Sequence, residues 1–201
     1  MRNPLQSNYD RLLEAALVEF GENGYEKAST AAICEHSGVS KGLLFFHFKS
    51  KSGLFFHILR GILDAMMQAL PEPGTHNGST FYETILTYER AKLAYVMERP
   101  REYLFLCEAF FNTPRRLSAE ITALYNDLAR VYWDVFTGLE AADGIDKKKV
   151  IELIAIVSRS LTQKYAHALL KEPDGMLRID ALLDEANEYF HILLLGVDKK
   201  S

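Results

Sequence analysis

The segment SGVSKGLLFFHFKSK, residues 37 to 51, combines cations with large apolar side chains. It contains three Lys, one His and no acid, together with five Leu or Phe residues. A buried segment does not tolerate three Lys, and a solvent-exposed loop does not favour three Phe. The segment therefore predicts a short helix with one side in a small core and a basic side that contacts an anion.

The charge distribution supports an anion partner at one end of the chain. The net charge is −4 at pH 7, but residues 1–60 hold 7 Lys+Arg against 6 Asp+Glu, whereas residues 61–201 hold 16 against 21. No acid lies between His36 and Leu63, a window that carries four Lys or Arg. A local basic patch on an acidic chain fits contact with a polyanion such as nucleic acid. A solvated basic face is the alternative.

The residues around this segment predict two short helices and the turn that joins them. Ser29 is a suitable N-cap for a helix that reaches about His36, and Ser40 for a second helix that reaches about Phe48. Gly38 lies between them and accepts the left-handed conformation of a tight turn. A longer helix precedes the pair, so the pattern indicates a three-helix domain with a helix-turn-helix.

The second short helix has side chains suited to the major groove of DNA. Lys recognises guanine edges there, and apolar groups meet thymine methyl groups. Lys51 begins the following helix, where its charge and the free N–H groups can hold phosphate. The alternative for the Phe residues, a stacking platform for single-stranded bases, is disfavoured because Phe48 is needed in the core. The predicted DNA-contacting residues are Ser29, Thr30, Ser40, Lys41, Gly42, Leu43, Phe45, Phe46, His47 and Lys51.

Residues 15–55, AALVEFGENGYEKASTAAICEHSGVSKGLLFFHFKSKSGLF, resemble the DNA-binding segment of TetR-type transcriptional regulators. Three positions depart from the family pattern: Ser29 replaces Thr, Cys34 replaces Ala, and Phe45 stands where the family often has a phosphate-contacting Tyr. The matching positions are Phe20, Gly24, Tyr25, Ile33, Gly38, Val39, Ser40, Gly42, Leu44, His47, Phe48, Ser50, Lys51 and Leu54.

The remainder of the chain predicts helices only, so the expected class is all-α with about nine helices. The periodicity favours helices over roughly 80–98, 102–111, 114–136, 147–171 and 179–197, and no alternating strand pattern is present. We expect a DNA-binding domain over residues 1–53. We expect a larger effector-binding and dimerisation domain over residues 54–201.

The last two predicted helices are apolar on more than one side, which requires more than one packing partner. The resemblance implies a homodimer in which these helices form a four-helix bundle. One larger monomeric core is the alternative. The predicted interface residues are Ala155, Ser158, Thr162, Phe190, Leu193 and Leu194.

The middle helices are rich in aromatic residues, and the resemblance implies that they enclose a small-molecule effector. Aromatic side chains there suit a large apolar or aromatic compound. Plain core packing is the alternative for the aromatic residues, and surface exposure for the polar ones. The candidate ligand-binding residues are Tyr88, Tyr95, Glu108, Phe111, Asn112, Trp133, Arg159 and His167.

The sequence carries no pattern typical of catalysis, metal binding or cofactor binding. Cys34 and Cys107 have no disulfide or metal-ligand spacing, the six His form no HExxH motif, and no glycine-rich phosphate loop occurs. The polar N-terminus and the absence of a membrane-spanning run predict a cytoplasmic protein without a membrane partner. We therefore predict a ligand-responsive repressor that binds a double-stranded palindromic operator, not an enzyme. The alternative is an all-helical enzyme or hydrophobic-ligand carrier with a basic anion-binding patch.

Overall fold

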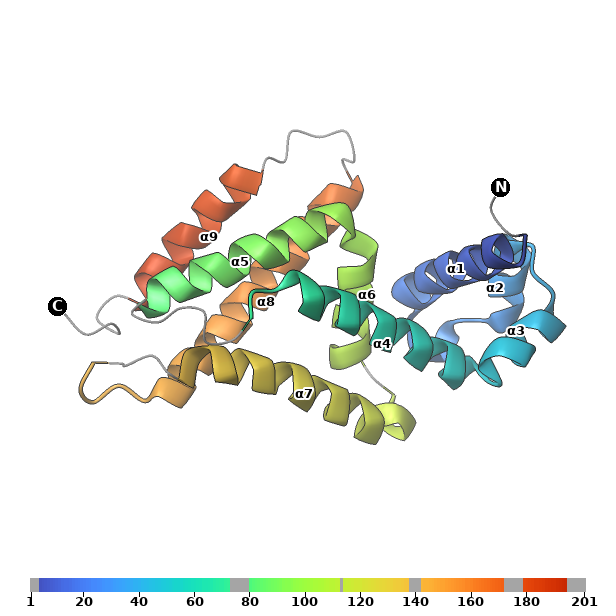
Figure 1. Cartoon of the computed structure of the whole chain (residues 1–201), viewed down its shortest axis with the longest axis horizontal. Coiled ribbons are helices and arrows are strands. Elements are labelled where there is room, and N and C mark those ends of the chain that lie inside the picture. Colours follow the sequence, from blue (N-terminus) through green and yellow to red (C-terminus); the bar gives the residue numbers. More distant parts are fainter. Residues whose placement is uncertain (1–3, 73–79, 113, 138–141, 172–178, 195–201) are drawn as a thin grey trace. The chain divides into compact units, whose positions relative to one another are not determined.

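The computed structural model describes residues 4–72, 80–112, 114–137, 142–171 and 179–194. Over these residues the chain forms nine α-helices and one short 3₁₀ helix, with no strand (Figure 1), as the sequence predicted. In chain order they are α1 (Pro4–Lys27), α2 (Thr30–Ser37), α3 (Lys41–Phe48), α4 (Lys51–Ala69), α5 (Phe81–Glu98), α6 (Pro100–Phe111), η1 (Arg115–Leu117), α7 (Ser118–Thr137), α8 (Lys147–Lys171) and α9 (Ile179–Leu194).

The chain divides into two compact units, which we call unit 1 and unit 2. Unit 1 comprises Met1–Ala65 and Arg101–Thr122, and unit 2 comprises Met66–Pro100 and Ala123–Ser201. Unit 1 thus contains the region expected to bind DNA, residues 1–53, together with most of α4, α6 and the 3₁₀ helix η1. The segment around α6 therefore folds with the N-terminal helices, although it is distant from them in sequence.

Local capping explains why α2 and α3 begin and end where they do. The Ser29 hydroxyl accepts a hydrogen bond from the Ala31 N–H at 3.2 Å, and the Ser40 hydroxyl accepts one from the Leu43 N–H at 3.3 Å. Both contacts satisfy N–H groups that the first helical turn leaves without partners. Gly38 ends α2 with a left-handed φ of 68°. The predicted caps and turn are confirmed.

Unit 1 has a small core to which every one of its helices contributes. Leu12, Ile33 and Leu44 are fully buried side chains of α1, α2 and α3. The Phe105 ring of α6 lies 5.2 Å from the ring of Phe55 in α4, measured between centroids. Burying such a side chain contributes about 1.5–3 kcal/mol, so α6 adds a substantial share of the stability of this small domain.

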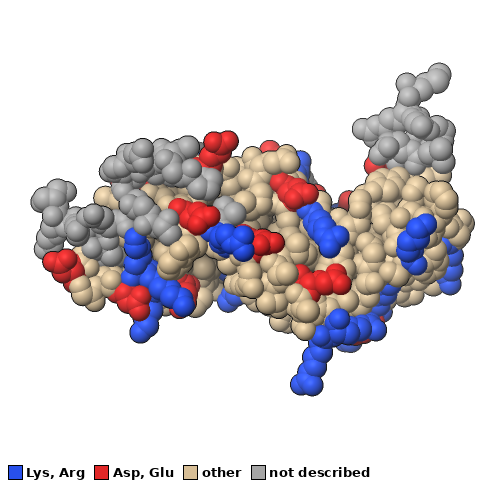
Figure 2. All heavy atoms as spheres, turned by 60° about the horizontal axis from the view of Figure 1, so that its bottom comes forward, with Lys and Arg blue, Asp and Glu red and all other residues tan. Residues whose placement is uncertain are grey.

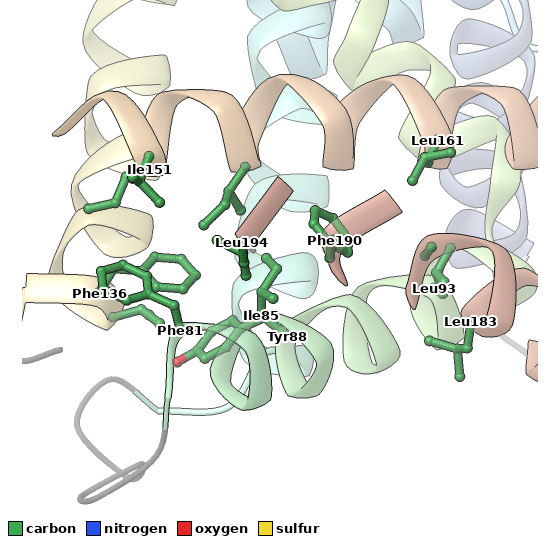
Figure 3. Packing of buried hydrophobic residues seen from close by; sticks show 14 of the residues in the cluster. Phe81, Ile85, Tyr88, Leu93, Phe136, Ile151, Leu161, Leu183, Phe190 and Leu194 are labelled. Carbon is green, nitrogen blue, oxygen red and sulfur yellow. The ribbon is translucent and has the colours of Figure 1, made fainter. Parts of the chain in front are cut away.

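Unit 2 has a separate apolar core that α5, α7, α8 and α9 share (Figure 3). The rings of Phe81 in α5 and Phe136 in α7 stack at 5.9 Å, and Phe190 of α9 is fully buried in the same cluster. Tyr165 of α8 donates a hydrogen bond to Glu185 Oε2 at 2.9 Å, which ties α8 to α9. The buried sides of these four helices therefore pack against one another within one chain.

Two helix starts differ from the sequence prediction. Helix α6 begins at Pro100 rather than Glu102 because Pro suits a first helical position. Pro114 does not open an α-helix: its backbone is extended, and its carbonyl accepts from the Leu117 N–H at 2.9 Å to form η1. The last three residues of the helix predicted over 179–197 lie outside the described residues.

Candidate nucleic-acid interface

Helix α3 separates a buried side from an exposed side, as a groove-binding helix requires. Leu44 and Phe48 are buried, while Lys41, Gly42, Phe45, Phe46 and His47 are exposed and Leu43 is half-buried. Phe45 is 40% exposed and Phe46 69% exposed. Both rings therefore lie outside the core of unit 1. The helix presents cationic and aromatic side chains outward on one short element.

The N-terminal ends of α2 and α3 lie at the surface of unit 1. Ser29 and Ser40 are exposed, and Thr30 is half-buried. The Ser29 N–H donates to Glu19 Oε1 at 2.8 Å, and Glu19 is itself 9% exposed. This nearly buried acid therefore holds the start of α2 against α1.

The turn between α3 and α4 ends the exposed helix sharply. Lys49 adopts a left-handed φ of 64°, an uncommon conformation for a residue other than Gly. Its Nζ donates to the Phe46 carbonyl at 2.8 Å and lies 5.4 Å from the centre of the Phe46 ring. The Ser50 hydroxyl then accepts from the Gly53 N–H at 2.9 Å and caps the start of α4. The lysine charge is thus held beside an exposed aromatic ring.

Lys51, expected to hold phosphate, also contacts the end of α1. Its Nζ donates to the Glu26 carbonyl at 3.2 Å and lies 4.7 Å from the centre of the Tyr25 ring. Burial, followed by the nearby Arg116 guanidinium, lowers the pKa of Lys51. An ammonium group carries three protons, so one hydrogen bond to a carbonyl leaves capacity for a phosphate oxygen.

Two supporting contacts in unit 1 were not predicted from the sequence. Arg116 forms an ion pair with Glu26 at 2.7 Å and lies 5.1 Å from the Tyr25 ring centre, so η1 braces the end of α1. The Tyr9 hydroxyl shares a 2.6 Å hydrogen bond with His57 Nε2, which links α1 to α4. These partners are between 48 and 90 residues apart, and no local sequence signal connects them.

The exposed side of this region is cationic and largely free of acids. The right-hand end of Figure 2 carries α2 and α3 and shows Lys and Arg side chains among mostly uncharged surface. The segment from α3 to the middle of α4 contains no Asp or Glu. A short helix with this surface fits the dimensions and the phosphate charge of a DNA major groove.

Residues 12–58 match the family model described as bacterial regulatory proteins, tetR family. The match includes the caps, the Gly38 turn and the whole of α3. The chain is a transcriptional regulator with a DNA-binding domain of the tetR family. Such proteins regulate transcription by binding DNA, and they are not enzymes.

Similarity to other regulators extends beyond the helix-turn-helix. The chain is 26% identical over 136 residues to the HTH-type transcriptional regulator SAR2658 of Staphylococcus aureus, which covers 68% of this chain and 71% of the relative. A TetR family transcriptional regulator from Chloroflexus aurantiacus has a TM-score of 0.74 at 16% identity, covering 97% of this chain and 95% of that one. FadR of Bacillus subtilis, in complex with stearoyl-CoA, has a TM-score of 0.66 at 14% identity, covering 94% and 99%. At these identities the two structures establish a shared fold.

The eight candidate effector-binding residues of the regulator divide between the two units. Glu108, Phe111 and Asn112 belong to unit 1, where Asn112 Nδ2 donates to Glu108 Oε2 at 2.6 Å. The other five belong to unit 2. Within unit 2, Tyr88 and Tyr95 are buried, Arg159 is half-buried, and Trp133 and His167 are exposed.

Most of the predicted dimer-interface side chains are already buried inside a single chain. Ser158, Thr162, Phe190 and Leu194 lie within unit 2, and Leu193 packs against its core, while Ala155 is exposed. Periodicity correctly indicated apolar helix faces but could not distinguish an intramolecular partner from a second subunit. The large exposed apolar residues of α8 and α9 are instead Leu153, Ile156, Leu170, Tyr189 and Ile192.

The sequence prediction missed a buried polar cluster between α5 and α8, formed by Glu89, Lys92 and Ser158. All three side chains are at most 3% exposed. Lys92 Nζ lies 2.8 Å from both Glu89 carboxylate oxygens, and Ser158 bonds to both partners. The available signal was that Glu89 and Lys92 fall on the largely apolar side of α5, at helical spacing from Ile85 and Val96. We call this group the α5–α8 polar cluster.

Two further kinds of site are not found among the described residues. Within the described ranges, no three His, Cys, Asp or Glu side chains are grouped to hold a metal ion. Among the described helices, none offers an apolar stretch of the length that a bilayer crossing requires.

Proposed function

We propose that this regulator is a repressor that binds a palindromic operator as a homodimer and is released by a small apolar or aromatic effector. The observation that carries the DNA-binding part is the exposed side of α3. It presents Lys41, Phe45, Phe46 and His47 with no acid, on a helix whose start is capped and whose opposite side is buried.

The homodimer part of the proposal is supported by the exposed apolar residues of α8 and α9. Ile156 and Leu153 lie three residues apart on α8, and Tyr189 and Ile192 three apart on α9. Each of these side chains is about half exposed or more. Apolar residues repeated at this spacing form a stripe that favours contact with another helix. A two-fold dimer would present two α3 helices to successive major grooves, which accounts for a palindromic site.

The effector part of the proposal is supported by the composition of unit 2. Tyr88 and Tyr95 are buried on α5 within or beside an apolar core, where a ligand would have to replace core contacts with its own apolar surface. FadR of B. subtilis was solved with stearoyl-CoA, whose acyl chain is long and apolar. A differential affinity of about 1–3 kcal/mol between the DNA-binding and the released state is sufficient for a switch.

Binding-site selection on random double-stranded DNA with the full-length protein tests the DNA-binding part. We expect a two-fold symmetric consensus. Lys41→Ala should weaken binding to it and reduce the slope of log affinity against log salt by about 1 per subunit if Lys41 neutralises a phosphate. Lys148→Ala, an exposed lysine of α8, is the matched control and should leave both unchanged. Selection of no consensus would contradict the proposal.

Sedimentation velocity tests the homodimer. Ile192 is 72% exposed and Ile145 41% exposed, so neither substitution to Asp should disturb the core. We expect Ile192→Asp to sediment as a monomer and to lose operator affinity, because a charge buried in an apolar interface is costly. Ile145→Asp, which lies before α8, should remain dimeric. If both Ile192→Asp and Ile145→Asp remain dimeric, the dimer interface does not include Ile192.

A thermal-shift screen with fatty acyl-CoA and aromatic compounds tests the effector. A true effector should raise the melting temperature and release the protein from its operator. Tyr95→Leu should reduce this response if Tyr95 lines the effector site, whereas Tyr125→Leu, an exposed residue of α7, should not. A compound that stabilises the protein without releasing DNA would contradict its role as inducer.

A further inference from the structure

We infer that Phe46 is the residue through which this regulator recognises thymine, by contact with the C5-methyl group in each operator half-site. The inference rests on the proposed DNA-binding function and adds the base chemistry of one operator position. It assigns a specificity role to an aromatic side chain that the fold does not use in its core.

The position of Phe46 on α3 carries the inference. The buried residues Leu44 and Phe48 lie two positions before and two positions after it. Two residues turn an α-helix by about 200°, so Phe46 points almost directly away from the core. Its 69% exposure agrees with that placement. Any groove that receives the exposed side of α3 therefore meets the Phe46 ring first.

The surroundings of the ring hold it in place without covering it. The His47 ring contacts it edge-on at 5.3 Å between centroids, and the Lys49 ammonium lies 5.4 Å from its centre. Beside it, a Cβ added at Gly42 would meet only the Ser40 hydroxyl within 4 Å, at 3.9 Å. The missing side chain at Gly42 leaves space for a base edge to approach next to Phe46.

The chemistry of the groove selects the partner of this ring. Base edges in the major groove present hydrogen-bond donors and acceptors, and the thymine methyl is their apolar group. A phenyl ring cannot satisfy a donor or an acceptor, so a polar base edge under it would lose its water without compensation. A thymine methyl has no such cost. The Lys49 charge beside the ring suits the phosphates that line the same groove.

Replacing thymine by uracil tests the inference, because uracil lacks only the methyl group. In the operator obtained by selection, each thymine is replaced in turn, and affinities are measured by fluorescence anisotropy at fixed salt. At one thymine per half-site, we expect uracil to weaken wild-type binding about four-fold, and about 15-fold when both half-sites are changed, as burial of one methyl-sized group predicts.

The variants decide whether Phe46 makes the contact. Phe46→Ala should be insensitive to uracil at that position, whereas Phe45→Ala, the other exposed Phe of α3, should retain the four-fold effect. Melting curves of both variants should match the wild type because neither ring is buried. Equal uracil sensitivity in wild type and Phe46→Ala would overturn the inference.

Other outcomes separate this inference from the function on which it rests. If uracil at every position leaves wild-type affinity unchanged, Phe46 packs against sugar–phosphate. The inference would then be wrong, but the proposed binding to an operator would still hold. Tighter binding to single strands than to the duplex would assign the ring to base stacking and overturn both. Selection of no operator would remove the DNA-binding proposal and this inference with it.

Discussion

Replacement of Lys92 by Met should destabilise the regulator strongly, because it breaks the α5–α8 polar cluster from one side. The Lys92 ammonium lies 2.8 Å from both carboxylate oxygens of Glu89, and the two side chains are 3% and 1% exposed. Without the ammonium, Glu89 keeps Ser158 as its partner but remains a charge in an apolar core. Removing one partner of a buried ion pair costs about 3–5 kcal/mol, a large share of the roughly 5–15 kcal/mol that stabilises a typical domain.

Urea unfolding followed by far-UV circular dichroism measures this loss. Protein concentration must be held constant, since a homodimer would make the apparent stability depend on it. We expect the midpoint of Lys92→Met to fall steeply. The triple variant Glu89→Met, Lys92→Met, Ser158→Ala removes all three polar groups at nearly constant volume. It should recover most or all of the stability, because apolar replacement of a whole buried pair is often neutral or stabilising by about 1–4 kcal/mol.

The pair of variants makes the reasoning refutable. If Lys92→Met lowers the unfolding free energy by less than about 1 kcal/mol, the loss is no larger than that of an exposed ion pair. Such a result would show that the ammonium reaches solvent. A triple variant less stable than Lys92→Met would show that the cluster stabilises the fold by more than its desolvation costs. Either result would refute the expectation that an unpaired Glu89 charge is what destabilises Lys92→Met.

Three further substitutions probe the helix-turn-helix. Gly38→Ala should cost about 1–2 kcal/mol of unfolding free energy in a urea titration, because an L side chain is strained at a φ of 68°; an unchanged midpoint would mean that the turn relaxes. Phe45→Tyr should tighten binding to operator and random DNA about ten-fold or more with no loss of melting temperature, because a hydrogen bond from its hydroxyl to a phosphate contributes roughly 1.5–3 kcal/mol. Lower stability without a gain in affinity would refute it. Lys51→Ala should reduce the slope of log affinity against log salt by about 1 per subunit. An unchanged slope would show that Lys51 contacts Glu26 and not DNA.

The sequence was sufficient to predict the helix-turn-helix, because the contacts that define this motif are local. A hydroxyl at Ser29 or Ser40 reaches N–H groups two or three residues away, and Gly38 supplies the turn by its own conformational freedom. These contacts depend on residue type and spacing alone, so α2 and α3 begin and end within a residue of the predicted positions. The exposed side of α3 followed from the same periodicity.

Only the tertiary structure decided which apolar faces pair within the chain and which remain exposed. Phe190 and Ile192 are both apolar residues of α9, yet the first is fully buried and the second is 72% exposed. Helical periodicity reports the direction of a side chain, not the element that lies in that direction. The same holds for Arg116 and Glu26, 90 residues apart, and for the contact of Ser158 with Glu89, 69 residues apart. Such contacts depend on how distant helices pack, and no spacing along the chain encodes that packing.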